Sequence, residues 1–528
     1  MSRTVARGNM SKRGGALTCL GLLVFCLLAY EIMSYGGVRS PDSEIVFRTS
    51  DALVTRGNLA VERGLEGWPG FGVATGVDGR SYSIFGPLEA VAASPLTALG
   101  HVLADRGVFR SSTVPLPISF NVENGLQDFL ADGRTTARDE NGIRWVASQL
   151  NVLVTALTVV LVYLTAFLLV GSQVASVTTA FIYGFGTLAW PYSGTFFSEP
   201  LASLFVLAAL YLLLVDEPNR GNPPSMTRAV CAGLCLGLAT CAHVTAALFA
   251  PVFLLYAAYP IFHRRNERPA WALSAGFAVG LGVVLILLGF YNFERFGSFL
   301  ETGRTVDPRA VVEFDYGVFT SPFQGLYGLL LAPNKGLLLF APIVVLAVFA
   351  WPRMHRQYPI LANMLAGAVV LRILFIASRS DWHGGFSLGP RHLVMALPLV
   401  CLPLGFLVQD AIRSGRLAWG LLVSAAWLAV CQQYYFALGE IFSFYYLKMW
   451  QAQDAGQNPF AGNQVYLQWT NGSLSRLLAG PRGPWVLRQV PLDNQALFIL
   501  GCGIFAVLAV LAFAIGRSHV IASQKPAR

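Results

Sequence analysis

Charged side chains are scarce in this sequence. Asp, Glu, Lys and Arg make up only 12% of its 528 residues, whereas a soluble globular protein carries about 25%. Hydrophobic residues make up 55% and come in long unbroken blocks. Many blocks reach about 18 residues, enough to cross a hydrocarbon core of roughly 30 Å as a helix. The scarcity of charge therefore argues against a soluble protein and predicts an all-α polytopic membrane protein.

Cysteines in polar segments, internal repeats and a leader-peptide cleavage site are lacking as well. All eight cysteines lie inside apolar blocks, at Cys19, Cys26, Cys231, Cys235, Cys241, Cys401, Cys431 and Cys502. We therefore expect neither a disulfide framework nor a cysteine zinc site. The basic N-terminus leads into an apolar run that no small-residue cleavage site follows, which predicts an uncleaved first membrane helix.

The apolar blocks predict a bundle of about twelve transmembrane helices. We place them at about 15–35, 145–170, 174–191, 197–215, 229–245, 246–262, 270–291, 337–351, 358–377, 393–410, 417–437 and 495–515. Twelve spans put both termini on one side. Segments on that side hold sixteen Lys and Arg in about 60 residues, against twenty in roughly 230 on the other. Because basic loops stay in the cytoplasm, we predict cytoplasmic termini and an inner (plasma) membrane location.

The long polar segments all fall on the outer side, at about 36–144, 292–336, 378–392 and 438–494. Long outer loops on a helical bundle predict chemistry at the outer surface. Within the first, residues 86–104 are too interrupted to span and predict a helix lying in the membrane interface. We divide the chain into a catalytic bundle with the first outer loop, a later outer loop, and a last helix with its cytoplasmic tail, at 1–437, 438–494 and 495–528.

Three acidic residues are candidates for chemistry on the outer side. Asp42 and Glu44 stand just beyond the first predicted helix, in "SPDSEIVF". They suit the deprotonation of an acceptor hydroxyl or the binding of a divalent cation, although acidic loop residues are usually just solvated. Glu199 precedes the fourth predicted helix on the same side. It is either a helix N-terminal charge or a second carboxylate of the same cavity.

The loop "SRSDWHGGFSLGPRHL" gathers further candidates around its glycines, namely Trp382, His383, Arg391 and His392. Glycine lets a backbone turn tightly or approach a ligand. An arginine can grip a phosphate with two hydrogen bonds, and a tryptophan offers a flat apolar face to a sugar ring. The alternative interpretation is an ordinary turn with an interfacial aromatic anchor.

Two more basic residues lie at membrane depth or at its edge. Arg372 interrupts the apolar run "AGAVVLRILFIAS". An arginine at the bilayer centre costs roughly 2.5–3.5 kcal/mol, so Arg372 should face the protein interior or a cavity, unless it lies near a helix end and snorkels. Lys335 is predicted at the outer mouth of the eighth helix. There it either contacts a lipid-linked phosphate or anchors the helix at the headgroups.

Four motifs together resemble the GT-C superfamily of membrane glycosyltransferases, which includes the protein O-mannosyltransferases and the lipid A aminoarabinose transferases. They are "PDSE" after the first helix, "FFSEPL" at the fourth, "YNFERFGSFLETG" after the seventh and "DWHGGFSLGPRHLVMALP" leading into the tenth. The phrase "YSIFGPLEAVAASP" in the first outer loop also looks like bacterial relatives of this group. The resemblance covers most of the chain up to about residue 410.

The resemblance implies a GT-C-like bundle, a sugar donor carried on polyprenyl phosphate, and inversion at the anomeric carbon. Asp42 matches the acidic motif and would be the general base, with Glu44 as its neighbour or a metal ligand, although the intervening Ser43 departs from the usual adjacent acids. Glu199 matches a second acidic position. We expect the donor phosphate at Lys335, Arg391 and His392, and a cavity lined by Trp382, His383 and Arg372.

Partners follow from this expectation. They are a polyprenyl-phosphate-linked sugar, membrane lipids, and an acceptor that is a protein, a lipid or a glycan. A divalent metal ion is the one cofactor considered. The net charge of +9 is explained by the cytoplasmic loops, so no nucleic-acid partner is expected. A twelve-helix secondary transporter and a lipid-linked glycan ligase or polymerase are the alternatives. The missing repeat argues against the first, and the acidic motif after the first helix against the second.

Overall fold

Most of the chain is helical. A computed structural model describes the protein over residues 12–33, 37–62, 64–65, 70–111, 138–215, 225–263, 268–308, 318–438, 445 and 463–467. Regular structure in these ranges consists of helices and one small antiparallel sheet. The predicted helical class is thus correct for the bundle. The sheet was not predicted, and it belongs to the first of the segments expected as outer loops.

The bundle is built from long helices joined by short helical turns. The long helices are α1 (Lys12–Met33), α6 (Arg138–Val170), α7 (Gln173–Gly186), α9 (Glu199–Val215), α10 (Met226–Ala242), α11 (Phe249–His263), α12 (Arg268–Phe296), α16 (Val344–Gln357), α17 (Pro359–Ala377), α19 (Leu404–Ser414) and α20 (Arg416–Leu438). The turns are α8 (Ala189–Ser193), η2 (Val244–Leu248), α14 (Pro322–Leu330), α15 (Leu337–Phe340), η3 (Arg391–Ala396), α18 (Leu397–Cys401) and α22 (Gln464–Leu467).

The bundle of membrane helices is confirmed, whereas the number of twelve spans stays a prediction. Within the described ranges, five helices are long and apolar enough to cross a membrane, and six if the bent pair Arg391–Cys401 and Leu404–Ser414 counts as one span. The five are α1, α6, α12, α17 and α20. Other predicted spans are helical but shorter, because extended residues such as Thr187 and His243 end helices within the apolar blocks. The segment 495–515 lies outside the described residues.

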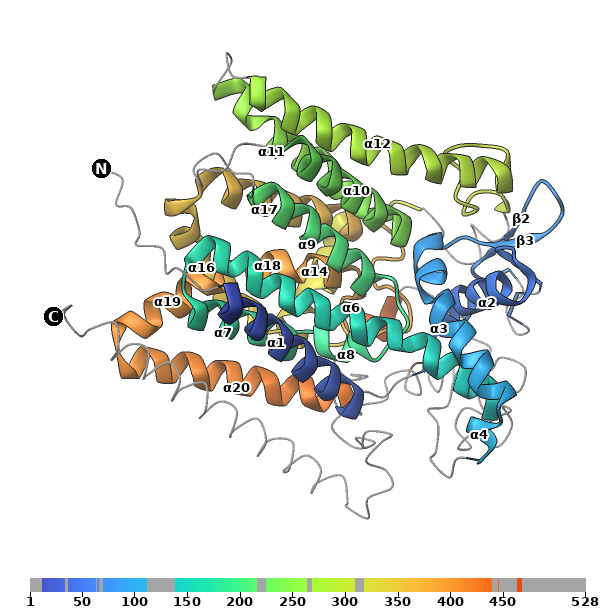
Figure 1. Ribbon diagram of the computed structural model, residues 1–528, viewed down its shortest axis with the longest axis horizontal. Coiled ribbons are helices and arrows are strands. Elements are labelled where there is room, and N and C mark those ends of the chain that lie inside the picture. Colours follow the sequence, from blue (N-terminus) through green and yellow to red (C-terminus); the bar gives the residue numbers. More distant parts are fainter. Residues whose placement is uncertain are drawn as a thin grey trace.

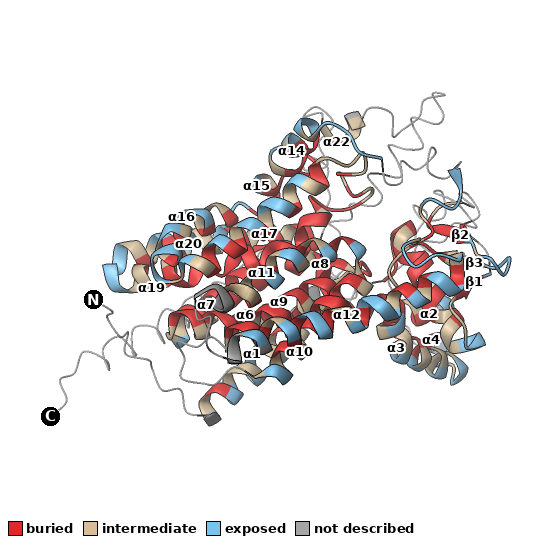
Figure 2. Ribbon diagram, turned by 90° about the horizontal axis from the view of Figure 1, so that it is seen from above, coloured by how far each residue is buried: buried red, intermediate tan, exposed pale blue. Residues whose placement is uncertain are grey.

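Apolar side chains cover both the inside and the outside of the bundle. The interior of α6, α7 and α9 is buried, whereas α12 and α20 turn large apolar side chains outward, among them Ile286, Phe290 and Leu421 (Figure 2). Water would disfavour such an exposed apolar surface, and a lipid bilayer would accept it. The bundle is therefore built to stand in a membrane.

The first predicted outer loop contains the helix predicted at 86–104, here α3, and further elements that were not predicted. It contains α2 (Pro41–Arg56), α3 (Pro87–Asp105), α4 (Val108–Ser111) and the strands β1 (Ala60–Val61), β2 (Val73–Thr75) and β3 (Ser81–Ser83), in the antiparallel order β1-β3-β2. The Ser40 hydroxyl caps α2 by accepting the Ser43 amide hydrogen, and Gly57 ends it with a φ of 66°. Because Ser40 starts a helix so early, Asp42 and Glu44 lie in its first turn and not in a loop.

The α2–α3 unit and the basic helix ends lie at opposite ends of the bundle. Figure 1 shows α2, α3 and the strands β2 and β3 at one end, with α16 and α19 toward the other. The basic residues His355 and Arg356 close α16, and Arg413 closes α19. Which end faces the outside stays a prediction.

Helices α10 and α12 approach each other closely, because glycine faces the neighbouring backbone on both. A Cβ atom at Gly233 would lie 2.1 Å from the Phe277 carbonyl oxygen, and one at Gly280 would lie 2.0 Å from the Val230 carbonyl oxygen. Small residues allow such contact between membrane helices. The packing fixes the position of α10, and α10 ends directly before His243.

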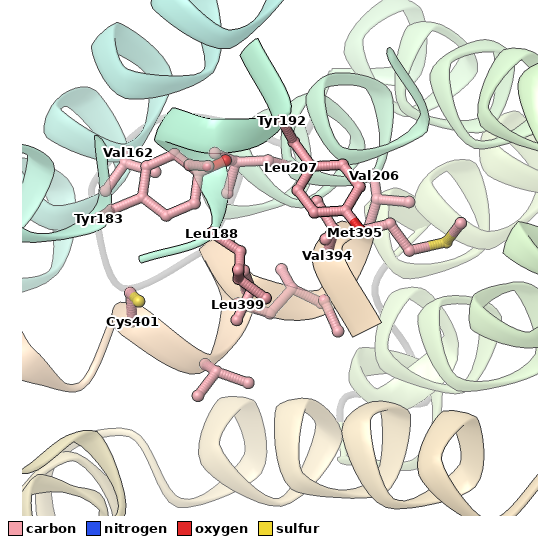
Figure 3. Close-up of a cluster of buried hydrophobic side chains, with 14 of the residues drawn as sticks. Val162, Tyr183, Leu188, Tyr192, Val206, Leu207, Val394, Met395, Leu399 and Cys401 are labelled. Carbon is pink, nitrogen blue, oxygen red and sulfur yellow. The ribbon is translucent and has the colours of Figure 1, made fainter. Parts of the chain in front are cut away.

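A dense apolar cluster supports the segment that follows the glycine-rich loop. Figure 3 shows Val394 and Met395 of η3 packed beside Val206 and Leu207 of α9, with Tyr192 at the same place. The Tyr192 hydroxyl donates a hydrogen bond of 2.8 Å to the Leu388 carbonyl oxygen. Two distant parts of the chain, the start of α9 and the start of η3, are thereby held side by side.

Candidate active site

Two carboxylates flank one guanidinium at this meeting point. Arg391 Nη1 donates a hydrogen bond of 2.6 Å to Asp42 Oδ2, and Arg391 Nε lies 3.1 Å from Glu199 Oε1. The exposed fraction of the side chain is 19% for Asp42, 12% for Arg391 and 2% for Glu199. Solvent can therefore reach the cluster at Asp42, whereas Glu199 is buried.

Each member is placed by a local feature of the sequence. Asp42 stands in the first turn of α2 because Ser40 caps that helix. Glu199 is the first residue of α9, where the helix dipole favours a negative charge. Arg391 follows a loop in which Gly384, Gly385 and Gly389 all have positive φ values. Side chains with a Cβ atom rarely adopt that conformation, so the glycines decide the path that delivers Arg391 to the carboxylates.

Two histidines complete the cluster. His243 Nε2 lies 3.6 Å and His392 Nδ1 lies 3.8 Å from Glu199 Oε1, and the two rings stand 5.8 Å apart. His392 was expected from the sequence, but His243 was not. A signal for it was present, since a lone histidine in the apolar stretch "ATCAHVTAAL" is costly in a membrane protein unless it faces a polar interior.

Glu199, His243 and His392 could hold a metal ion. Their ligand atoms all lie within 4.8 Å of one another. Two imidazoles and a carboxylate are a common donor set for zinc. The hydroxyl of Thr245 contacts His243 Nδ1 at 2.9 Å, which leaves Nε2 facing Glu199. Metal-binding histidines usually hold their second ring nitrogen in such a hydrogen bond. The residues present therefore fit a divalent ion.

Arg372 supports the cluster from behind. It is fully buried, which confirms that it faces the protein interior and does not snorkel. Its Nε donates to the His392 carbonyl oxygen at 2.7 Å, and its Nη1 donates to the carbonyl and hydroxyl oxygens of Thr245 at 3.2 Å. One side chain thus ties together the backbone segments that carry the two histidines.

Glu44 has a different environment from Asp42. Its carboxylate accepts hydrogen bonds from Arg144 Nε at 3.0 Å, Arg144 Nη2 at 2.8 Å and Arg48 Nε at 2.9 Å, and its side chain is only 1% exposed. Burial raises the pKa of Glu44, but the two arginines outweigh burial, so the pKa lies below its usual value. These contacts anchor α2 to α6. A role of Glu44 in catalysis or metal binding stays a prediction.

Lys335 lies inside the protein and not at an exposed helix mouth. It is fully buried. Its Nζ atom donates hydrogen bonds to the Gly385 carbonyl oxygen at 2.8 Å and to the carbonyl and hydroxyl oxygens of Ser387 at 2.7 and 3.0 Å. An ammonium group has three hydrogens to donate, so these contacts occupy all of them. Lys335 therefore holds the glycine-rich loop, and contact with a phosphate stays a prediction.

Trp382 and His383 also support this loop. The Trp382 side chain is 1% exposed, and it packs so closely on Gly328 that a Cβ there would lie 2.1 Å from its ring. His383 stacks on Tyr466 with ring centroids 4.0 Å apart, and its Nδ1 atom accepts the Gly385 amide hydrogen at 2.9 Å. Burial leaves little of the Trp382 ring for a ligand, and Tyr466 covers one face of the half-buried His383 ring. Their expected contact with a sugar stays a prediction.

Comparisons with solved structures find low-identity neighbours. The structure of ArnT from Cupriavidus metallidurans bound to undecaprenyl phosphate is 13% identical, with a TM-score of 0.45 over 96% of this chain and 79% of that one. The Archaeoglobus fulgidus oligosaccharyltransferase in the apo form is 14% identical, with a TM-score of 0.46 over 85% of this chain and 60% of that one. Both neighbours are GT-C proteins.

The archaeal enzyme has also been solved in complex with Zn and sulfate, at 13% identity to this chain and a TM-score of 0.45. No protein-family model and no curated protein matches the sequence. At such identities and TM-scores, the likeness transfers neither an activity nor a residue role to this chain.

Proposed function

We propose that the protein is an inverting glycosyltransferase that moves a sugar from polyprenyl phosphate to an acceptor hydroxyl at the outer face of the inner membrane. The supporting observation is the placement of Asp42 and Glu199 on either side of Arg391. A carboxylate next to a fixed cation suits this reaction. The carboxylate can remove the proton of the acceptor hydroxyl, and the cation can stabilise the negative charge that develops on the leaving phosphate. The acceptor is a protein, a lipid or a glycan.

The donor chemistry needs a cation and the acceptor chemistry needs a base. A polyprenyl phosphate leaves more readily when its developing charge is neutralised by a positioned arginine. A sugar or protein hydroxyl is a weak nucleophile and needs a carboxylate within hydrogen-bond distance. Arg391 and Asp42 supply these two groups side by side, because their hydrogen bond of 2.6 Å links them before any ligand binds.

The transfer is a single displacement. The Asp42 carboxylate accepts the proton of the acceptor hydroxyl. At the same time, the oxygen of that hydroxyl bonds to the anomeric carbon of the sugar. The bond between that carbon and the phosphate oxygen breaks on the opposite face, and its electron pair leaves with the polyprenyl phosphate. Attack opposite to the leaving group inverts the anomeric centre. Asp42 then gives the proton to solvent, which its partly exposed position permits.

A metal ion fits beside this chemistry. Glu199, His243 and His392 would hold it, on the evidence of their donor set and their mutual spacing. A bound divalent ion would add positive charge near the phosphate. Glu199 also holds Arg391 at the Asp42 carboxylate through the 3.1 Å ion pair. Metal binding by Glu44 stays a separate prediction, because its oxygens contact Arg144 and Arg48 in this structure.

Transfer by the purified protein tests the proposal. The protein, reconstituted in liposomes, receives synthetic polyprenyl-phosphate monosaccharides with radiolabelled sugars and an extract of cell-envelope acceptors. We expect release of polyprenyl phosphate and label in the acceptor fraction, with an anomeric configuration opposite to that of the donor. Uptake of labelled free solute without any donor cleavage would contradict this function and support the transporter alternative.

A further inference from the structure

The guanidinium of Arg391 has two edges on which a phosphate could form a pair of hydrogen bonds. One edge carries Nε and Nη2, and the other carries Nη1 and Nη2. Arginine commonly binds phosphate through two adjacent N–H groups of this kind. Glu199 Oε1 lies 3.1 Å from Nε, and Asp42 Oδ2 accepts a hydrogen bond of 2.6 Å from Nη1. Each edge therefore has a carboxylate at one of its two nitrogens.

The Nη1–Nη2 edge is the more accessible of the two. Glu199, at the other edge, is buried, whereas Asp42 is partly exposed. The Phe197 ring lies against the guanidinium, with its centroid 4.6 Å from Arg391 Cζ, and helps to fix it in place. Asp42 stands in the first turn of α2, where a change of side-chain rotamer would move the carboxylate off Nη1 without altering the helix.

The contact between Asp42 and Arg391 opposes the proposed role of each side chain. A phosphate on the Nη1–Nη2 edge would bring a second anion against the Asp42 carboxylate, and like charges so close together repel each other. Asp42 is limited as well, because its Oδ2 atom accepts a hydrogen bond from Arg391 instead of one from an acceptor hydroxyl. A ligand that breaks this ion pair would release both side chains for the reaction.

We propose that Asp42 occupies the donor-phosphate position on Arg391, and that an arriving polyprenyl-phosphate donor displaces it and so frees it to act as the base. This inference rests on the proposed glycosyltransferase function. The phosphate takes the Nη1–Nη2 edge, and both oxygens of the displaced carboxylate become free for the acceptor hydroxyl. Donor binding therefore precedes activation of the acceptor.

Binding of polyprenyl phosphate tests this displacement apart from catalysis. The purified full-length protein in lipid nanodiscs is titrated with polyprenyl phosphate, the leaving group of the proposed reaction, and with polyprenol, which has the same tail but no phosphate. Asp42→Asn removes the competing charge, and Glu199→Gln removes the charge at the other edge. Asp51→Asn is the matched control, because Asp51 lies on the same helix but pairs with His101 at 2.7 Å.

We expect Asp42→Asn to bind polyprenyl phosphate roughly 5- to 20-fold more tightly than the parent, because a charged partner of the arginine is replaced by a weaker neutral one. Glu199→Gln should not gain affinity, Asp51→Asn should bind like the parent, and all four proteins should bind polyprenol alike. In the transfer assay, Asp42→Asn should combine a lower KM for the donor with its lower kcat, a split that lost stability would not produce. Thermal melting checks that each variant is folded.

Two outcomes would overturn the inference and leave the proposed function intact. One is a folded Asp42→Asn protein that binds polyprenyl phosphate no more tightly than the parent. The other is an equal gain in Glu199→Gln or Asp51→Asn, because the loss of any nearby negative charge would then explain the effect. In both cases the parent still transfers sugar. A parent protein that transfers no sugar and binds polyprenyl phosphate no better than polyprenol would contradict the proposed function itself.

Discussion

Asp42 is the residue on which the chemistry depends most directly. It reaches the cluster from the first turn of a helix, and its side chain is partly exposed and paired with Arg391. These facts revise the sequence-based picture of a free loop carboxylate. They also explain how a base can be held in place without being shut away from an acceptor.

Asp42→Asn should lower the rate of sugar transfer by about 10²–10⁴-fold, the usual contribution of a general base. The amide keeps the shape of the side chain but does not accept the proton. Thermal melting should change little, since the amide oxygen still accepts a hydrogen bond from Arg391. Transfer from radiolabelled polyprenyl-phosphate sugar measures the loss, and an Asp42→Asn variant that transfers at the parent rate would remove the base assignment.

Glu44→Gln should act on stability more than on chemistry. It removes the charge that two arginines share, and breaking a buried ion pair costs about 3–5 kcal/mol when one partner is lost. We expect a clear fall in melting temperature, in contrast to Asp42→Asn, with the remaining folded protein still active. A variant that melts like the parent but is inactive would instead move the general base two residues along α2.

The stability of the parent should depend on acid through the same residue. The pKa of Glu44 is lower in the folded protein than in the unfolded chain. The contribution of its ion pairs is therefore complete above the unfolded pKa, about 4.3, and is lost as the pH falls through the folded pKa. Melting curves across this acid range should show a steeper loss for the parent than for Glu44→Gln.

At the scale of elements, the helices were predicted well and their interruptions poorly. Apolar blocks of about 20 residues predict helices by local hydropathy, and α6, α12, α17 and α20 lie where the blocks indicated. The break predicted between 245 and 246 lies slightly earlier, at the extended residue His243, because a single extended residue between two apolar helices leaves little mark in a hydropathy pattern. His243 stands at that break, whereas the prediction placed it inside a helix, and it lies 3.6 Å from Glu199.

The contact between α10 and α12 can be tested with a matched pair of substitutions. Gly280→Ala places a methyl group where a Cβ would lie 2.0 Å from the Val230 carbonyl oxygen, whereas Gly282 has no atom within 4 Å of the same position. Overpacking of this kind costs about 1–3 kcal/mol. We expect Gly280→Ala to lower the melting temperature and to reduce transfer by shifting His243. Gly282→Ala should do neither, and equal effects of the two would contradict close packing here.

At the scale of the whole molecule, the two ends of the bundle differ in structure. The α2–α3 unit lies at one end (Figure 1), and basic residues close α16 and α19 toward the other. The proposed reaction requires the first end to be outside, because the donor is expected in the outer leaflet. The orientation therefore decides whether the mechanism can operate.

Single cysteines at exposed positions test this orientation. Arg106→Cys, beyond the end of α3, should react with a membrane-impermeant maleimide in intact cells. Arg413→Cys, in the last turn of α19, should react only after permeabilisation. The parent protein is the background control for its own cysteines. Labelling in the reverse pattern would place the cluster in the cytoplasm and contradict an outer-leaflet donor.

The sequence alone determined the membrane class, the positions of most helices and the residue types of the cluster. These depend on local composition, since hydropathy, basic loops and glycine-rich stretches act within about 20 residues of chain. The meeting of Asp42, Glu199 and Arg391 was decided only by the tertiary structure. Residues 349 positions apart come within hydrogen-bond distance because helix packing brings α2, α9 and η3 together. No local pattern records that contact.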